Sequence, residues 1–287
     1  MDNPTITDCF VDWVTAVAPT GSHNSWLRRF LDGQDAKQTQ RAYHRSHALQ
    51  YYPSGIRHYY SPHDSEVDSV IVLDGDALNN IRRDHDNEWC NKVVAILARN
   101  SSHFSRVDLA VDIMDGGLLA HEMATDALDE VLSFGKRKCT VVRGVGQGGG
   151  TTLYAGARTS PKYMRIYDKN AESKGQIAST RIEFELKAEA AQAVSETLSL
   201  YGGHTLPCRL FTGILGEFND WEPYPVVQKI LYGEVTTLRP HKRERLMERK
   251  DWLRKQVMPT FTKGNTGNAL ELWQWFKETV EASHSAS

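Results

Sequence analysis

Three segments of the sequence carry polar side chains at alternate positions. The segments are RVDLAVDI (residues 106–113), YMRIYDK (163–169) and RIEFELK (181–187). Because successive side chains of a β-strand point to opposite faces, each segment is predicted to be a strand with one apolar and one polar face. The polar positions hold arginines, lysines and tyrosines together with four acids, Asp108, Asp112, Glu183 and Glu185.

These residue types suit the cleavage of a phosphodiester bond, provided that the three strands lie in one sheet and their polar faces meet. Carboxylates bind a hard divalent ion, which polarises a phosphoryl oxygen. Cations attract the phosphate, and a phenol oxygen can attack phosphorus. Asp108 and Asp112 would be roughly 13 Å apart along a regular strand, so they are not expected to bind the same ion. An alternative is a solvated sheet face on which arginines pair with carboxylates across strands.

The remaining sequence predicts the elements that would position these strands. Further strands are predicted at residues 9–19, 58–62 and 69–75, and a strand–glycine loop–strand unit at 139–156. Residues 20–48 are expected to form a polar loop with a short helix. Helices are predicted at 76–100, with Asp76 as N-cap and an interruption around 84–86, and at 119–135, 188–200, 226–235, 242–257 and 270–283.

Hairpins mixed with helices favour an α+β fold with a mainly antiparallel sheet covered by helices. The strand pattern stops after Lys187, and only helical patterns follow it. A first domain over residues 1–195 and a helical C-terminal region over residues 196–287 are therefore expected.

The charge of the chain is nearly balanced, with a formal net charge of −2 at pH 7. A nucleic-acid partner would therefore have to meet local basic patches. In residues 25–60, basic residues are interleaved with aromatic ones; residues 239–255 form a second basic stretch. Its candidate DNA contacts are Arg243, Arg245, Arg249 and Lys250. A solvated basic surface would explain either patch equally well.

Several classes of protein do not fit the sequence. No apolar run approaches the roughly 18–20 residues of a membrane span, and the N-terminus does not have the pattern of a signal peptide. A cytoplasmic protein without a membrane partner is therefore expected. The four cysteines are far apart and include no C-x-x-C pair, which argues against a zinc knuckle. The GVGQGG segment (144–149) precedes a predicted strand rather than a helix, so a hairpin tip is favoured over a dinucleotide site.

Three motifs of the chain follow one another in a recognisable order. They are SRVDLAVDI (105–113), TTLYAGARTSPKYMRIYDKNAE (151–172) and TRIEFELK (180–187). In order and spacing they resemble the motifs of the rolling-circle replication initiation factor family, over residues 8 to 190 or so. The resemblance implies a replication initiator that nicks one strand of origin DNA. A tyrosine would keep the 5′ phosphate as a covalent ester and leave a 3′ hydroxyl as primer.

The resemblance also implies a nucleophile. Tyr167, in the R-I-Y-D-K segment, is the candidate, while Tyr154 and Tyr163 are its rivals. Arg165 and Lys169 lie on either side of Tyr167, and their positive charge is expected to favour the phenolate and attract the phosphate.

The acids of the R-x-D and R-x-E segments, Asp108 and Glu183, are implied to bind a divalent metal ion, Mg or Mn. Asp112 and Glu185 are secondary candidates for the same role. Two further DNA contacts are expected in the central motif, Arg158 and Lys162. The sequence has no His–hydrophobic–His pair, so the metal site of the His-pair nickases is not expected.

Origin DNA, in a single-stranded or cruciform region, is the expected partner. A host helicase and a second copy of the chain are further candidates. The rival hypothesis is a DNA-binding protein of the same fold that regulates a mobile element without cutting it.

Overall fold

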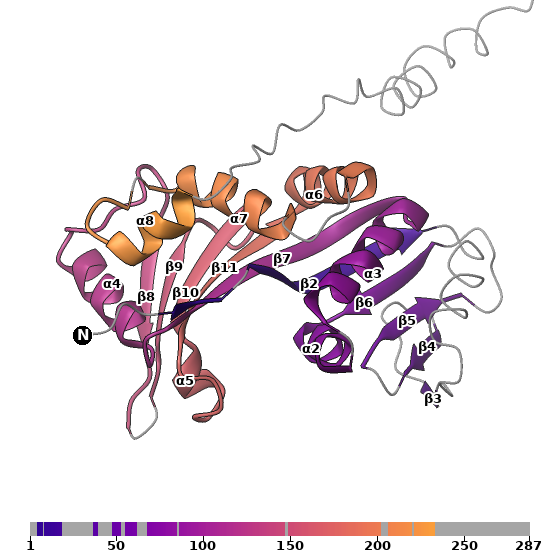
Figure 1. The fold of residues 1–287 in the computed structure, drawn as a ribbon, viewed down its shortest axis with the longest axis horizontal. Helices are drawn as coiled ribbons and strands as arrows, with labels where there is room; N and C mark the ends of the chain where they lie inside the picture. Colours follow the sequence, from indigo (N-terminus) through magenta and orange to yellow (C-terminus); the bar gives the residue numbers. More distant parts are fainter. Residues whose placement is uncertain are drawn as a thin grey trace, which may run out of the picture. The chain divides into compact units, whose positions relative to one another are not determined.

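An antiparallel sheet forms the centre of the structure, which is a computed structural model (Figure 1). The structure describes residues 5–7, 9–18, 37–39, 48–52, 55–61, 68–84, 86–146, 149–201, 206–219 and 221–232. The strands are β1 (Thr5–Ile6), β2 (Phe10–Ala18), β3 (Lys37–Thr39), β4 (Ala48–Tyr51), β5 (Arg57–Tyr60), β6 (Ser69–Leu73), β7 (His103–Met114), β8 (Cys139–Arg143), β9 (Thr151–Ala155), β10 (Lys162–Asp168) and β11 (Thr180–Lys187). Their order in the described sheet is β3-β4-β5-β6-β2-β7-β11-β10-β9-β8, and β1 pairs with β7 outside this path.

Helices cover the sheet, so the expected α+β fold with a mainly antiparallel sheet is confirmed. They are α2 (Gly75–Asp84), α3 (Asn87–Asn100), α4 (Leu118–Leu128), α5 (Lys169–Glu172), α6 (Ala188–Tyr201), α7 (Leu206–Gly216) and α8 (Pro225–Leu231). Helices α6, α7 and α8 lie together along one face of the sheet (Figure 1). Of the helices described, none combines the length and the apolar character that crossing a bilayer requires.

The described residues on both sides of residue 195 belong to one compact unit, Met1–Arg239. Residue 195 itself lies within α6. The assignment of separate roles to residues 1–195 and 196–287 stays a prediction, and the helices expected at 242–257 and 270–283 lie outside the described residues.

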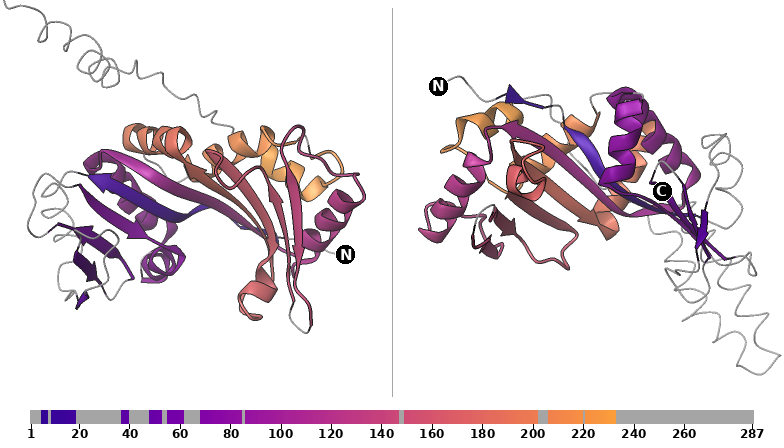
Figure 2. Two further views of the ribbon diagram at one scale, coloured as in Figure 1. Left: turned by 180° about the vertical axis from the view of Figure 1, so that it is seen from behind. Right: turned by 90° about the horizontal axis from the view of Figure 1, so that it is seen from below.

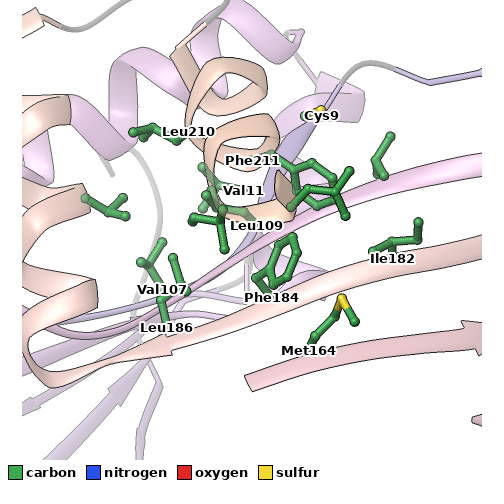
Figure 3. Close-up of a cluster of buried hydrophobic side chains, with 14 of the residues drawn as sticks. Cys9, Val11, Val107, Leu109, Met164, Ile182, Phe184, Leu186, Leu210 and Phe211 are labelled. Atoms are coloured by element: carbon green, nitrogen blue, oxygen red, sulfur yellow. The ribbon is translucent and has the colours of Figure 1, made fainter. Parts of the chain in front are cut away.

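The apolar face of the central strands forms the core with helices α6 and α7. Leu109 of β7, Ile182 and Phe184 of β11 and Met164 of β10 are all fully buried on this face (Figure 3). The Phe184 ring packs against Phe211 of α7, with 5.0 Å between the ring centroids. This packing fixes β11 from one side, and the alternate side chains of the same strand are presented on the opposite face.

Two aspartates explain where α2 and α3 begin. The predicted interruption is confirmed, since α2 ends at Asp84 and the Asp86 carboxylate accepts a hydrogen bond from the backbone N–H of Trp89 at the start of α3 (2.6 Å). The expected cap at Asp76 is wrong. Helix α2 begins one residue earlier, and Asp74 accepts the bond from the N–H of Ala77 (3.0 Å). A carboxylate three residues before a free N–H is the usual capping geometry.

A short helix ends the strand that carries Tyr167. Lys169 was predicted to continue that strand, but β10 ends at Asp168 and Lys169 opens α5. The Asp168 carboxylate accepts a hydrogen bond from the N–H of Ala171 (3.0 Å) and contacts Nε2 of His121 (3.2 Å). Asp168 therefore caps α5 and ties it to α4, which holds the end of β10 in place.

Several elements were not predicted. Strand β3 occurs within residues 20–48, where a loop with a short helix was expected, and β4 begins at the end of that range. Both strands continue the sheet beyond β5 by antiparallel pairing. Helix α7 was also not predicted. Its sequence contains Pro207 at the second position, where proline is compatible with the first turn of a helix.

The glycine-rich segment joins β8 and β9 into an antiparallel hairpin, as predicted. Its two sides approach so closely that a Cβ atom on Gly149 would lie 2.5 Å from the backbone oxygen of Gly144. The hairpin lies beside α5 in both figures (Figures 1 and 2), and a Cβ on Gly150 would lie 2.8 Å from that of Ala171. A strand follows the glycines, so no helix N-terminus is present here to bind a pyrophosphate.

The core packing of β11 predicts a stability effect. Replacing Phe184 with Ala should lower the free energy of unfolding by about 3–5 kcal/mol, because it removes a fully buried ring that packs against Phe211 of α7 and against Phe218 in the turn after this helix. Urea unfolding followed by circular dichroism measures the change. The matched control is Leu128→Ala at the exposed end of α4, which should change stability by less than about 0.5 kcal/mol. Equal effects of the two changes would contradict this description of the core.

Candidate active site

The three polar strands are neighbours in the sheet, in the order β7-β11-β10, so the condition on which the interpretation of their polar faces depended is met. In the register of these strands, Asp108 of β7 pairs with Glu185 of β11. Arg165 of β10 pairs with Glu183, and Tyr167 pairs with Arg181. One continuous surface therefore carries the acids, the cations and the phenol.

This surface is polar but not solvated. The exposed fractions are 1% for Asp108, 4% for Glu183 and 3% for Glu185. Arginines cover the carboxylates: Arg106 donates to Asp108 through two nitrogens, with Nε at 2.8 Å from Oδ1, and Arg165 donates to both Asp108 and Glu183. The cross-strand pairs of the alternative interpretation are present, but they are buried. Buried ion pairs are costly to form, so the sheet places them here at the expense of stability.

The hydroxyl group of Tyr167 is hydrogen-bonded to a carboxylate rather than to a cation. It donates a hydrogen bond to Oε2 of Glu183 (3.1 Å). Burial raises the pKa of Tyr167 above its ordinary value, and the negative charge of Glu183 adds to this effect. The expectation that Arg165 and Lys169 lower this pKa is therefore wrong. Arg165 donates a hydrogen bond to the Glu183 carboxylate, and Lys169 pairs with Glu172 (2.6 Å). The Nζ atom of Lys169 lies 5.8 Å from the centre of the Tyr167 ring.

Asp108 and Glu183 lie close enough for their carboxyl groups to share a hydrogen bond. Burial raises the pKa of Asp108, although Arg106 and Arg165 oppose the shift. Burial and the neighbouring Asp108 raise the pKa of Glu183 to about 8, against the effect of Arg165. Two adjacent buried carboxyls retain a proton unless another cation compensates their charge.

The secondary candidates, Asp112 and Glu185, are held in separate ion pairs. Both oxygens of Asp112 accept hydrogen bonds from Arg181, at 2.7 and 2.8 Å. Glu185 pairs with Lys187 and with Arg106, and these contacts outweigh burial and lower its pKa. The structure thus brings Asp108 together with Glu183 and sets Asp112 apart with Arg181.

Asp12 of β2 is a further acid at the site, which the sequence interpretation missed. The register between β2 and β7 shifts between Val11 and Trp13, so that Val11 packs in the core while both Asp12 and Trp13 contact arginines of the polar surface. A β-bulge has this effect. Asp12 Oδ2 accepts a bond from Arg181 (3.0 Å). The sequence signal for this residue was an acid within an otherwise apolar strand. Strict alternation along the strand could not show to which face of the sheet the Asp12 side chain points.

A cavity of about 340 Å³ opens where these groups meet. Its lining includes Asp12, Asp108, Tyr167, Arg181 and Glu183, together with Gly75 and Asn79 at the start of α2. The Oδ1 atom of Asp12 is buried and has no hydrogen-bond partner among the described residues. Within the described part of the chain, no group of three or more His, Cys, Asp or Glu side chains is arranged to hold a metal ion.

The predicted DNA contacts are only partly described. Arg158 is exposed, in the turn that precedes β10. Lys162 pairs with Glu217 (2.5 Å), beside the C-terminal end of α7. Arg243, Arg245, Arg249 and Lys250 lie outside the described residues, as does most of the basic and aromatic stretch 25–60.

A comparison with protein families shows to which family the chain belongs. Residues 102–280, more than half of the sequence, match the model of a family described as "Replication initiation factor". The chain belongs to the replication initiation factor family. The matched range includes β7, β10 and β11, which carry Asp108, Tyr167 and Glu183. Membership confirms the resemblance found in the motifs and gives the protein a role in the initiation of replication.

The fold of this replication initiation factor is similar to a solved structure described as the rolling circle replication initiator protein from Geobacillus stearothermophilus. The two chains are 19% identical, the match covers 75% of this chain and 86% of the other, and the TM-score is 0.56. This likeness confirms the fold. A search of curated proteins gave no match.

The raised pKa of Glu183 predicts how stability depends on pH when no divalent ion is present. Between about pH 4.5 and 8 the folded protein retains a proton that the unfolded chain releases, so this group's contribution falls as pH rises through that window and is constant above it. Thermal unfolding in EDTA from pH 5 to 9 measures this dependence of stability on pH. Glu183→Gln should flatten the profile, whereas Glu189→Gln, at an exposed position in α6, should leave it unchanged. If the melting temperatures of the parent and of Glu183→Gln depended on pH in the same way, the raised pKa of Glu183 would be refuted.

Proposed function

We propose that this replication initiation factor nicks one strand of origin DNA through a covalent phosphotyrosine formed by Tyr167. The observation that supports this role is the hydrogen bond from the Tyr167 hydroxyl to Glu183, a buried carboxyl beside a cavity. A phenol is mostly protonated at neutral pH and needs a base to attack phosphorus. Oε2 of Glu183 is within hydrogen-bond reach of the proton that must be removed, and it could accept that proton once a bound divalent ion had compensated the charge of the two acids and left Glu183 ionised.

In the proposed step, Oη of Tyr167 forms a bond to phosphorus as the bond from phosphorus to the 3′ oxygen breaks. The phenol proton passes to Oε2 of Glu183, and the departing 3′ oxygen takes a proton from water. The products are a 5′ phosphate esterified to Tyr167 and a free 3′ hydroxyl, which can prime synthesis. Arg165, already bonded to Glu183, is positioned to attract the phosphate that enters the cavity.

The acids of the cavity fit a divalent ion. Asp108 and Glu183 are adjacent buried carboxyls with raised pKa values, and Asp12 lines the same cavity, its Oδ1 accepting no hydrogen bond from the described residues and lying 3.8 Å from a guanidinium nitrogen of Arg82. A divalent ion such as Mg²⁺ or Mn²⁺, when bound, supplies positive charge to the phosphoryl oxygens. Mg²⁺ in proteins is commonly held by one or two carboxylates and several waters, so a pair of acids is sufficient to bind it. Asp108 and Glu183 would provide this pair.

Tyr167 is a better candidate than its two rivals. Tyr154 and Tyr163 stack on each other, with ring centroids 5.6 Å apart and planes inclined by 11°. Tyr167, by contrast, donates its proton toward a buried carboxyl in the acidic cavity. The basic residues Arg243, Arg245, Arg249 and Lys250 are proposed to hold duplex DNA near the origin by neutralising phosphates.

Tyr167→Phe should abolish nicking, lowering the rate by at least about a thousand-fold, because the attacking oxygen is lost. Tyr163→Phe is the matched control and should retain activity. The assay incubates each variant with a supercoiled plasmid that carries the cognate origin, in Mg²⁺ or Mn²⁺, and measures the relaxed product. Origin binding should be unchanged in both variants. A parent protein that binds the origin but never nicks it would favour the rival hypothesis of a non-catalytic regulator.

Asp108→Asn should slow nicking by more than about a hundred-fold, because it removes a ligand of the divalent ion. Such an ion, by compensating the charge on the phosphoryl oxygens, stabilises a transition state by several kcal/mol. A second readout does not depend on activity. Mn²⁺ should raise the melting temperature of the parent and of Glu189→Gln, but not that of Asp108→Asn, because an ion that binds only the folded state stabilises it. An equal Mn²⁺-induced rise in all three proteins would exclude Asp108 as a ligand.

A further inference from the structure

A second cavity lies beside the one at Tyr167, on the same face of the sheet. Its volume is about 550 Å³, within the range of sites that bind small ligands. The side chains that matter here are Lys138, Thr140, Tyr154, Arg158, Tyr163 and Arg165, from the segments around β8, β9 and β10. We refer to it below as the tyrosine groove.

Two stacked aromatic rings form part of the tyrosine groove. Tyr154 of β9 and Tyr163 of β10 have ring planes within 11° of parallel, and both side chains are partly exposed. Neither ring belongs to the hydrophobic core. A parallel, partly exposed aromatic pair offers a flat surface on which an unpaired base can stack.

The charges of the tyrosine groove differ from those of the cavity at Tyr167. Three cations, Lys138, Arg158 and Arg165, line the groove with a single acid, Glu185. In the neighbouring cavity, carboxylates outnumber cations. Lys138 and Arg158 are exposed, so they can bind phosphates without breaking an internal ion pair. The groove is therefore suited to a nucleic-acid strand rather than to a metal ion.

The two cavities are connected through one residue. Arg165 lines both of them, and it lies on β10 between Tyr163 and Tyr167. Tyr163 and Tyr167 are four residues apart on this strand, which corresponds to roughly 13 Å. At about 3.4 Å per stacked nucleotide, that distance spans at most about four nucleotides of DNA.

From this arrangement we infer that the tyrosine groove binds unpaired bases of the DNA strand that is cut, within about four nucleotides of the scissile phosphate. Tyr154 and Tyr163 stack on a base, and Lys138 and Arg158 bind the phosphates beside it. The inference rests on the proposed function for the location of the scissile phosphate, but binding in the groove requires no chemistry. A duplex cannot present a base face to the tyrosines, so the groove selects single-stranded DNA.

The first test compares the affinity for single-stranded and duplex DNA in the Tyr167→Phe background, which prevents cleavage. The probes are a fluorescein-labelled 15-nucleotide single strand of mixed sequence and the duplex that it forms with its complement. Tyr154→Leu combined with Tyr163→Leu should weaken single-strand binding at least about ten-fold and leave duplex binding unchanged. The paired change to Phe retains the rings and should preserve both affinities. Unchanged single-strand affinity in the Leu variant, or an equal loss for both probes, would overturn the inference.

The second test uses the exposed cations, whose replacement does not disturb the core. Lys138→Gln combined with Arg158→Gln should make the dependence of single-strand affinity on salt less steep, by about 1.4 in the slope of log K against log salt for two phosphate contacts. Lys92→Gln, at an exposed position in α3, is the matched control and should leave the slope unchanged. The same slope for the double variant and the control would also overturn the inference. Nicking that persists in Tyr167→Phe, together with the expected preference of the groove for single-stranded DNA, would refute the proposed function alone.

Discussion

The burial of Asp108 and Glu183 under Arg106 and Arg165 is the interaction on which the candidate site depends. Antiparallel pairing of β7, β11 and β10 brings these side chains together, and the core behind Phe184 keeps the strands in register. Removing one partner of a buried ion pair leaves an uncompensated charge, which is strongly destabilising. The arrangement is therefore costly for stability, and its value lies in holding acids, a phenol and cations in one place.

The same pairing explains the division of the polar surface into regions with different charges. Around Tyr167 the carboxylates predominate, and burial raises the pKa values of Asp108 and Glu183. Toward β8 and β9 the cations and the stacked tyrosines predominate. Arg165 lies between the two regions and is bonded to the acids of the first. Strand β10, which carries Arg165, thus links the proposed chemistry to the proposed binding of single-stranded DNA.

Alternation in the sequence was sufficient to predict the three central strands and the residues that share their polar face. It could not predict that the face is buried, because burial depends on which arginines cover the acids. The direction of Asp12 depends on a bulge in β2, and the partner of Tyr167 depends on the register of β10 against β11. For the same reason, proximity in the sequence could not show that Arg165 and Lys169 pair with carboxylates, and the expectation that they lower the pKa of Tyr167 was wrong.

Mapping of the covalent adduct tests the central claim most directly. After reaction with origin DNA and digestion of the DNA, trypsin should cut after Lys162, Arg165 and Lys169, which places Tyr167 alone in the peptide IYDK and Tyr163 in the separate peptide YMR. Mass spectrometry then identifies the modified peptide. The account predicts a nucleotide-bearing phosphate on IYDK. The same modification on YMR or on the peptide that contains Tyr154, or nicked product with no protein adduct, would contradict it.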